Sequence, residues 1–336
     1  MLEKPAIPDE SIIACLQAEF GLQITRLAFL PLGGDLSTAV YRVVAEDGTS
    51  YFCKLKRGVF DEVSVELPRF LSERGIPQII PPLVTKTGRL WADLDEFRLI
   101  LYPFVEGTSG FEVELSERQW ADFGAALKRI HALALPPQLR RKIRRESFSP
   151  EWREDCQDIL ARLDGRTFDN PVTAQWAAFL RPKRDTILDH IQRADRLARA
   201  LASRPTQEVL CHSDIHPGNL FIDRNETLFI VDWDYPMLAP KERDLMFIGG
   251  AQGYVNRTPE EEERLFYRSY GEVVIDPLAL AYYRYERNIM DITVECTRIL
   301  SEALGDQDRA QSQQILTWLF MPGGSVELAY GSDRTR

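Results

Sequence analysis

Three polar side chains in the second half of this 336-residue sequence have the types and spacing that phosphoryl transfer requires. Asp214 is followed five residues later by Asn219, and Asp232 closes an apolar stretch further along the chain. In phosphoryl-transfer sites one carboxylate accepts the proton of the attacking hydroxyl, while a carboxamide and a second carboxylate hold the metal that bridges the phosphates. Mg²⁺ prefers such hard oxygen ligands. The spacing therefore predicts Asp214 as the catalytic residue and Asn219 and Asp232 as ligands of Mg²⁺.

The residues around these side chains complete a longer motif. It reads His212-Ser213-Asp214-Ile215-His216-Pro217-Gly218-Asn219 and then Ile230-Val231-Asp232-Trp233-Asp234. The pair resembles H-x-D-x-x-x-x-N and hydrophobic-D-W/F-D/E in the aminoglycoside phosphotransferase and choline kinase branch of the protein-kinase-like superfamily. The resemblance implies a small-molecule kinase that uses ATP or GTP as phosphate donor and Mg²⁺ as cofactor. It also implies an α+β, bilobal protein-kinase-like fold, with an N-terminal antiparallel sheet plus helix and a larger, mainly helical C-terminal lobe.

In this family a lysine near the end of an N-terminal strand contacts the α- and β-phosphates of the nucleotide. Lys54 ends the run Tyr51-Phe52-Cys53-Lys54, and strand alternation places it on the face opposite Cys53. Lys56 shares that face and remains a second candidate. The resemblance therefore predicts Lys54 as the nucleotide-binding lysine.

A carboxylate from the following helix, predicted over residues 61–74, should orient this lysine. Glu62 and Glu66 both qualify, because residues four apart lie on one stripe of a helix. Glu62 is preferred, since Pro68 disturbs the backbone near Glu66.

Two further segments are expected to contact the nucleotide. The turn before the second strand stands where the superfamily places a phosphate-covering loop, and its amides and hydroxyls can reach phosphate oxygens. It lacks G-x-G-x-x-G, so taken alone it is only a turn. The hinge follows Tyr102, and adenine recognition there needs a backbone carbonyl and an amide two residues on. The predicted contacts are Gly34, Asp35, Ser37 and Thr38 in the loop and Pro103, Phe104 and Val105 in the hinge.

Strand signals dominate the first hundred residues. Runs rich in β-branched and aromatic side chains, separated by Gly-containing turns, predict strands over 24–30, 39–45, 49–55 and 98–105. The last strand runs into Glu106-Gly107, which marks the best boundary. We therefore predict an N-terminal nucleotide-binding lobe over residues 1–105 and a C-terminal catalytic and substrate-binding lobe over residues 106–336.

Helical periodicity dominates the remainder of the chain. Ser116 begins S-E-R-Q, the pattern of a capping box, and apolar residues then recur at helical spacing. Helices are expected over 150–203 and over 259–320, with a break at 271–277. Strands return at 208–211, 220–223 and 227–232. Asp244 is interpreted as a structural partner of the catalytic loop, and His212 as a hydrogen-bonding residue that supports the same loop.

Composition limits the partners and the compartment. The formal charge of −10 disfavours nucleic acid as a partner and favours a cationic substrate, although it can also serve solubility alone. Five scattered cysteines without a CxxC pair fit a reducing compartment. The first residues lack the layout of a secretory signal, and no apolar run reaches the roughly 20 residues of a membrane helix. The sequence therefore predicts a cytoplasmic protein without a membrane partner.

Several short segments extend the resemblance to a subgroup. Residues 52–56, 102–104, 211–216 and 236–244 resemble the spectinomycin 9-phosphotransferase group, and the similarity covers most of the chain. It implies ATP-dependent O-phosphorylation of an aminoglycoside or aminocyclitol antibiotic, with spectinomycin as the substrate that this resemblance favours, and hence resistance. Carboxylates for ammonium groups and aromatic faces for a ring would suit such a substrate. The candidate substrate residues are Asp234, Tyr283 and Glu286.

Two other functions stay open at this point. Another metabolite kinase of the same branch, acting on choline, homoserine or a sugar, would carry the same motifs. A non-catalytic nucleotide-binding pseudokinase is the alternative outside enzymes, and the intact set of Lys54, Asp214, Asn219 and Asp232 argues against it.

Overall fold

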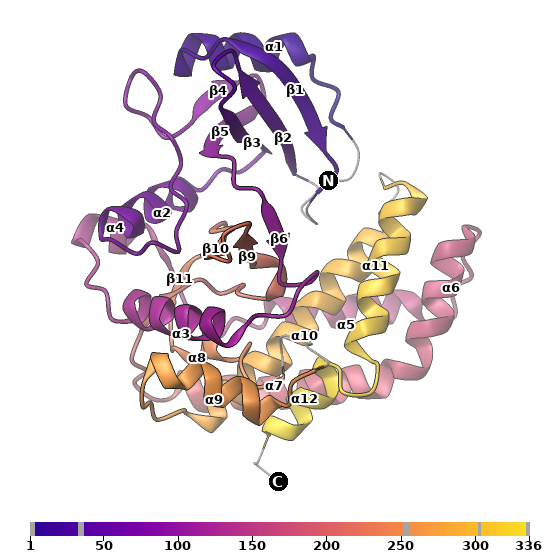
Figure 1. Ribbon diagram of the computed structural model, residues 1–336. Coiled ribbons are helices and arrows are strands. Elements are labelled where there is room, and N and C mark those ends of the chain that lie inside the picture. Colours follow the sequence, from indigo (N-terminus) through magenta and orange to yellow (C-terminus); the bar gives the residue numbers. More distant parts are fainter. Residues whose placement is uncertain (1–3, 33–36, 251–255, 302–303, 334–336) are drawn as a thin grey trace. The chain divides into compact units, whose positions relative to one another are not determined.

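The computed structural model describes residues 4–32, 37–250, 256–301 and 304–333. The chain packs into two compact units, each of which combines segments that are distant in sequence. The first unit contains Met1–Ile143 and Pro217–Pro236, and the second contains Arg144–His216 and Met237–Arg336. Figure 1 labels most of their helices and strands. The first unit extends past residue 105 to Ile143 and takes in Pro217–Pro236. A functional division at residue 105 stays a prediction.

The first unit is built on a five-stranded antiparallel sheet. Its strands run in the order β1-β2-β3-β5-β4. Their bounds are β1 Ile24–Leu30, β2 Thr38–Ala45, β3 Ser50–Arg57, β4 Ala92–Leu94 and β5 Phe97–Pro103. The strands predicted from β-branched and aromatic runs are thereby confirmed, with ends that differ by up to two residues.

One face of this sheet is apolar and covered by the N-terminal helix. Side chains of α1 (Asp9–Cys15) and of the π-helical turn Leu16–Phe20 pack with Tyr41, Cys53 and Leu101 into one buried cluster. The register pairs Val40 with Lys54 and Lys54 with Ile100. Because residues paired across strands point to the same side, Lys54 projects from the face opposite this cluster.

Two helices of the first unit begin at side chains that accept backbone hydrogens. Asp61 accepts the N–H of Val63, the first residue of α2 (Val63–Glu73), and Pro68 lies inside that helix. Ser116 caps α3 (Glu117–His131) in the capping box with Gln119 that the sequence predicts. The short helix α4 (Pro137–Lys142) packs on α2.

A small antiparallel sheet in the first unit joins segment Pro217–Pro236 to the chain that follows β5. Its strands are β6 (Gly107–Ser109), β9 (Leu220–Asp223) and β10 (Leu228–Ile230). The 3₁₀ turn Pro217–Asn219 directly precedes β9. A Cβ at Gly107 would lie 2.0 Å from the carbonyl oxygen of Ile222. Glycine is required there because the two backbones approach so closely.

The second unit is mainly helical and organised around one long helix. α10 (Pro277–Leu300) packs against α5 (Glu151–Leu163), α7 (Arg184–Ala202), α11 (Asp306–Leu319) and α12 (Ser325–Ser332). α6 (Pro171–Leu180), the 3₁₀ turn Arg181–Lys183, α8 (Glu242–Leu245) and α9 (Pro259–Tyr270) complete its helices among the described residues. The predicted break between helices is confirmed, since α9 ends at Tyr270 and α10 starts at Pro277.

A three-stranded sheet in the second unit carries the segment before the motif. Its order is β7 (Arg144–Arg145), β11 (Met237–Ala239) and β8 (Val209–Cys211), with β11 parallel to β7 and antiparallel to β8. β8 ends immediately before His212. In the part of the chain that the structure describes, no helix is both long and apolar enough to cross a bilayer.

Candidate active site

In the first unit, Lys54 joins the two carboxylates of the second motif. Its ammonium lies 2.9 Å from Asp232 and 2.7 Å from Asp234. The side chains of Lys54 and Asp234 are only 13% and 16% exposed, whereas that of Asp232 is 49% exposed. Lys56 approaches Asp234 at 3.4 Å from the same face of β3. Two lysines therefore face two carboxylates at this position.

Electrostatics keeps Lys54 charged. Burial alone would lower the pKa of Lys54, but the carboxylates of Asp232 and Asp234 raise it well above its usual value. Burial also raises the pKa of the neighbouring Tyr102 phenol, so this group stays protonated. Lys54 is thus a fixed cation beside the predicted metal ligand. Asp234, expected to bind substrate, is bonded to lysines in this structure, and its contact with a substrate stays a prediction.

The carboxylates expected to orient Lys54 have a different partner. Lys142, on α4, lies 3.2 Å from Glu62 and 2.7 Å from Glu66. Over the described ranges, the ion pairs of Lys54 are with Asp232 and Asp234 instead. The expected pair between Lys54 and Glu62 is therefore not formed here, because α4 supplies a closer cation to α2 than β3 does.

Asn219 and Asp232 are brought together by backbone pairing within the first unit. The N–H of Val231 donates to the carbonyl of Asn219 at 3.0 Å, which places the residue before Asp232 directly against Asn219. Asp232 adopts a left-handed backbone conformation, with φ of 63°. Non-glycine residues pay a steric cost for positive φ and keep it mainly where the surroundings enforce it. A carboxylate and a carboxamide on neighbouring backbone segments supply the oxygen donors that Mg²⁺ prefers.

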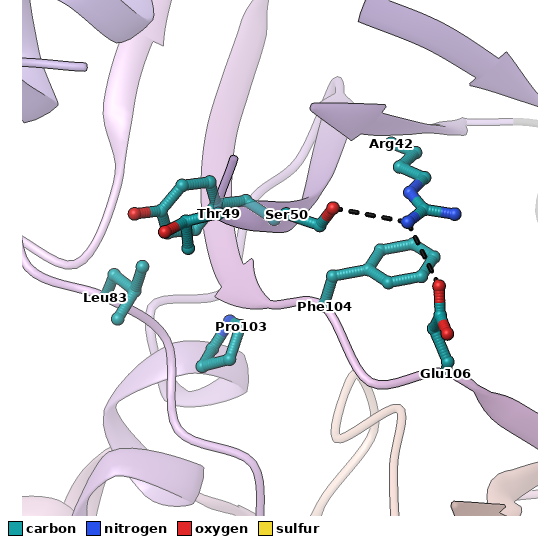
Figure 2. A pocket seen from close by; sticks show the side chains of 8 residues that line it. Arg42, Thr49, Ser50, Leu83, Pro103, Phe104 and Glu106 are labelled. Atoms are coloured by element: carbon teal, nitrogen blue, oxygen red, sulfur yellow. Dashed lines mark hydrogen bonds and ion pairs between the residues drawn. The ribbon is translucent and has the colours of Figure 1, made fainter. Parts of the chain in front are cut away.

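The predicted hinge borders a pocket of the first unit. The pocket has a volume of about 460 Å³ and is lined in part by Pro103 and Phe104, as Figure 2 shows. The guanidinium of Arg42 lies 4.5 Å from the centre of the Phe104 ring and donates to Glu106 at 3.0 Å. Val105 lies between Phe104 and Glu106 in the chain but is not part of the lining.

The predicted phosphate-covering loop is only partly described. Gly34 and Asp35 lie outside the described residues. The carbonyl of Ser37 accepts the N–H of Arg57 at 2.8 Å, and Thr38 is paired with Lys56 at the start of β2. Both residues therefore stand at the end of the strand pair that carries Lys54, and their contact with phosphate stays a prediction.

In the second unit, Asp214 is bonded to an arginine from α10. Its Oδ1 accepts a hydrogen bond from Nη1 of Arg287, whose Nε donates to Asp291 at 2.8 Å. Nε2 of His216 lies 3.7 Å from Oδ2 of Asp214. Burial alone would raise the pKa of Asp214, but the positive charge of Arg287, with a smaller contribution from His216, holds it well below its usual value. Asp214 is therefore ionised at neutral pH.

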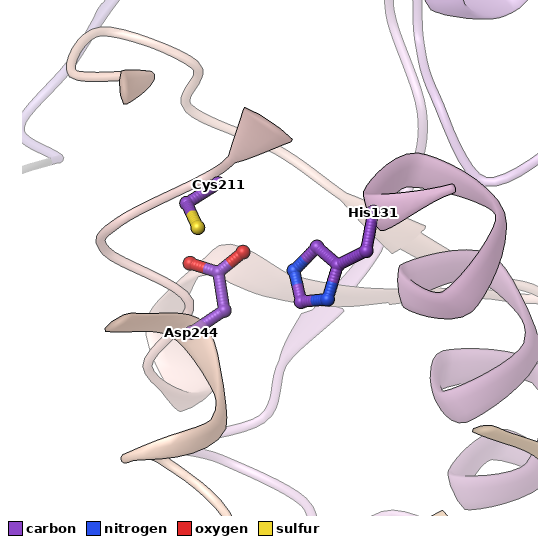
Figure 3. A group of neighbouring side chains, drawn as sticks. All are labelled: His131, Cys211 and Asp244. Carbon is purple, nitrogen blue, oxygen red and sulfur yellow. The ribbon is translucent and has the colours of Figure 1, made fainter. Parts of the chain in front are cut away.

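The backbone of the loop before Asp214 is held by a buried carboxylate, drawn with Cys211 in Figure 3. Asp244, which is fully buried on α8, accepts the N–H groups of His212 at 2.9 Å and Ser213 at 2.7 Å. Ser213 has a positive φ of 74°, so these bonds stabilise a strained turn. Nδ1 of His212 accepts the N–H of Asp214 at 3.3 Å. The supporting roles predicted for Asp244 and His212 are confirmed.

The other candidate substrate residues are buried in the second unit. Tyr283 is fully buried, and Glu286 is only 5% exposed. Glu286 is bonded to Arg153, which also binds Asp195 at 2.7 Å. Burial raises the pKa of Glu286, although Arg153 opposes the shift. In this structure both residues pack within the helices, and their contact with a substrate stays a prediction.

Sequence reasoning missed Arg287 and Lys142. Arg287 contacts Asp214, which is 73 positions away in the sequence. No local motif can therefore predict this contact. The spacing of four residues between Arg287 and Asp291 is visible in the sequence, but it indicates only an ordinary helical ion pair.

Comparison with known proteins identifies the class of enzyme. The sequence profile of the phosphotransferase enzyme family matches residues 28–282, which is most of the chain. The chain belongs to this phosphotransferase family. It is therefore an enzyme that transfers phosphoryl groups, and the aminoglycoside phosphotransferase resemblance of its motifs is confirmed.

Three relatives of this phosphotransferase illustrate the range of similarity. Spectinomycin phosphotransferase APH(9)-Ia is 35% identical in sequence to this chain, and the match covers 98% of this chain and 99% of that one. Its crystal structure in complex with ADP and spectinomycin superposes with a TM-score of 0.90. Protein StrN of Streptomyces griseus is 23% identical over 97% of this chain and 98% of its own. Amicoumacin kinase hAmiN shares the fold, at 16% identity and a TM-score of 0.63 over 95% of both chains. The expected α+β kinase-like fold is thereby confirmed.

Proposed function

We propose that this enzyme is an ATP-dependent O-phosphotransferase that phosphorylates a hydroxyl of an aminocyclitol antibiotic, with spectinomycin as the first candidate. The observation that supports this proposal most is the 35% identity over nearly the whole chain to a spectinomycin phosphotransferase. That relative was solved with ADP and spectinomycin, and a second structure of it, 34% identical to this chain, with AMP. The formal charge of −10 agrees with a cationic acceptor. The proposed consequence for a host cell is resistance.

The nucleotide side of the reaction is proposed for residues of the first unit. Lys54 would contact the phosphates, with Lys56 as the alternative, and the pocket at Pro103 and Phe104 would receive the base. The 13% exposed Lys54 side chain is positioned by two carboxylates. A positioned cation stabilises the charge of the transferring group without reorganisation.

Mg²⁺ is proposed to be held by Asn219 and Asp232. The fit rests on their oxygen donors, on their backbone contact through Val231 and on the exposure of half the Asp232 side chain. The ion would neutralise charge on the phosphates. Lys54, already bonded to Asp232, would then share that carboxylate with the ion, which ties the lysine and the metal to the same phosphates.

Asp214 is proposed to accept the proton of the acceptor hydroxyl. The Asp214→Asn variant keeps the size of the side chain and removes its charge. It should lower kcat by roughly 10² or more while leaving nucleotide affinity nearly intact, as single-turnover kinetics and calorimetry would show. Near-wild-type turnover of this variant would place the base elsewhere.

The substrate is tested by a panel assay. The enzyme is incubated with Mg²⁺, ATP or GTP and each of spectinomycin, a 4,6-linked aminoglycoside, choline, ethanolamine and homoserine, and kcat/KM is measured for each pair. We expect kcat/KM for spectinomycin to exceed kcat/KM for every metabolite by at least tenfold. A preference for choline or homoserine would transfer the enzyme to the metabolite kinases. Nucleotide binding without turnover of any of these acceptors would refute spectinomycin as the substrate and place the acceptor outside this panel.

A further inference from the structure

Helix α10 places an arginine against the residue proposed as the base. The guanidinium of Arg287 donates from Nη1 to Asp214 and from Nε to Asp291, one helical turn further on. Its side chain is 18% exposed, and its guanidinium lies 5.3 Å from the centre of the Phe247 ring. A planar guanidinium bonded to two carboxylates and packed on an aromatic ring has few alternative orientations. Arg287 is therefore held rigidly.

The helix that carries Arg287 is itself fixed. Arg284, one turn earlier, donates to the backbone carbonyls of Met246 at 3.1 Å and Ile248 at 2.6 Å, and so ties α10 to the segment that follows α8. The same segment contributes Phe247. The carboxylate of Asp214 is thus oriented from a 24-residue helix, while the backbone before it is oriented separately by Asp244.

We propose that Arg287, locked by Asp291, is a positioning residue that orients the Asp214 carboxylate for proton acceptance. In the reaction, the acceptor O–H bond breaks, its oxygen forms a bond to the γ-phosphorus, and the bond from that phosphorus to the β-phosphate oxygen breaks. The proton passes to Asp214 and then to solvent. This inference rests on the proposed function, because it takes Asp214 as the base.

Two physical effects favour such an arrangement. Burial would otherwise promote protonation of Asp214, and a protonated carboxyl cannot accept the hydroxyl proton. A nearby guanidinium weakens the base, but the loose transition state of phosphoryl transfer requires orientation of the hydroxyl more than a strong base. Among the described residues, Arg287, His216 and His212 of the same unit act on the charge of Asp214, and Asp291 acts through Arg287.

The test compares Arg287→Gln, Arg287→Lys and Asp291→Asn with the wild-type enzyme. Arg298→Gln is the matched control, since Arg298 lies on the same helix, pairs with Glu295 at 2.8 Å and is similarly covered, with 21% of its side chain exposed. For each protein, kcat and the KM values for ATP and for spectinomycin are measured in the steady state between pH 5 and pH 9. Single-turnover kinetics give the rate of the chemical step. Circular dichroism and thermal unfolding report whether each variant is folded.

Arg287→Gln should lower kcat at least tenfold, leave KM for ATP within twofold, and introduce a loss of kcat below about pH 6 that the wild type lacks. The sign follows because removing the cation raises the pKa of Asp214, so a growing fraction is protonated as the pH falls. Arg287→Lys should keep the wild-type pH profile with reduced kcat, Asp291→Asn should show a smaller loss, and Arg298→Gln should match the wild type.

A folded Arg287→Gln with wild-type kcat and pH profile would overturn the inference. If that variant does not fold, Arg287→Lys and Asp291→Asn decide, and wild-type kcat in both would overturn it. Asp214→Asn separates the two levels of the argument. Its inactivity beside an unaffected Arg287→Gln refutes only the role of Arg287, whereas an active Asp214→Asn refutes the proposed base itself.

Discussion

Removal of the Lys54 ammonium should lower the free energy of unfolding by about 2–3 kcal/mol, mostly through Asp234. The bond to Asp234, 2.7 Å long, joins two side chains that are 13% and 16% exposed. A charge-assisted bond so placed contributes about 1.5–3 kcal/mol. The bond to Asp232 reaches a carboxylate that is 49% exposed. Water screens it, and it contributes about 0–1 kcal/mol. Lys56 stays near Asp234 and limits the loss.

Double-mutant cycles measure the two contributions separately. Lys54→Met is combined with Asp234→Asn and with Asp232→Asn, and urea unfolding is followed by tryptophan fluorescence at pH 7 without metal or nucleotide. We expect a coupling energy of about 2 kcal/mol for Asp234 and below about 1 kcal/mol for Asp232. Lys142→Met with Glu66→Gln is the control, because that pair is also 2.7 Å apart but more exposed. A larger coupling for Asp232 than for Asp234 would refute the reasoning from burial.

Four further variants test the metal site, the buried ion pair and the loop support. Excess Mg²⁺ should restore activity to Asn219→Ala better than to Asp232→Ala, because a neutral ligand costs less to lose than an anionic one; equal rescue in a Mg²⁺ titration, or activity in EDTA, would contradict the metal assignment. Glu286→Gln removes the carboxylate that pairs with the buried Arg153 and should lower the free energy of unfolding by about 3 kcal/mol. KM for the acceptor should stay within twofold. A higher KM with an unchanged free energy of unfolding would make Glu286 a substrate residue. Asp244→Ala leaves two N–H groups without their acceptor and should lower kcat at least tenfold; wild-type kcat in a folded variant would show that this support is dispensable.

Local signals in the sequence predict most of the elements. Alternating apolar runs place β1 at Ile24–Leu30 and β9 at Leu220–Asp223, where the structure has them. Ser116 and Gln119 predict the start of α3, because a capping box satisfies backbone groups within four residues. These features depend on neighbours in the chain, which is why a single sequence reveals them.

Ion pairing between distant elements is not visible in the same way. Glu62 and Glu66 share a helical stripe as predicted, but the cation that meets them is Lys142, 76 residues beyond Glu66. Arg287 likewise reaches Asp214 across 73 residues. Such contacts depend on how helices pack. Helical spacing alone allows several ion-pair partners and does not distinguish between them. The sequence offers Tyr283 and Glu286 of α10 as substrate residues, whereas helix packing buries both side chains.

Phosphorylation of spectinomycin itself is the most direct test of the proposed function. The purified enzyme is incubated with Mg²⁺, ATP and spectinomycin, and the products are followed by ³¹P NMR and mass spectrometry, with Asp214→Asn as the matched control. We expect a new phosphomonoester resonance on the antibiotic, formed in equal amount with ADP by the wild type and at least 10²-fold more slowly by the variant. ADP formation without phosphorylated antibiotic, or equal rates in the two proteins, would contradict it.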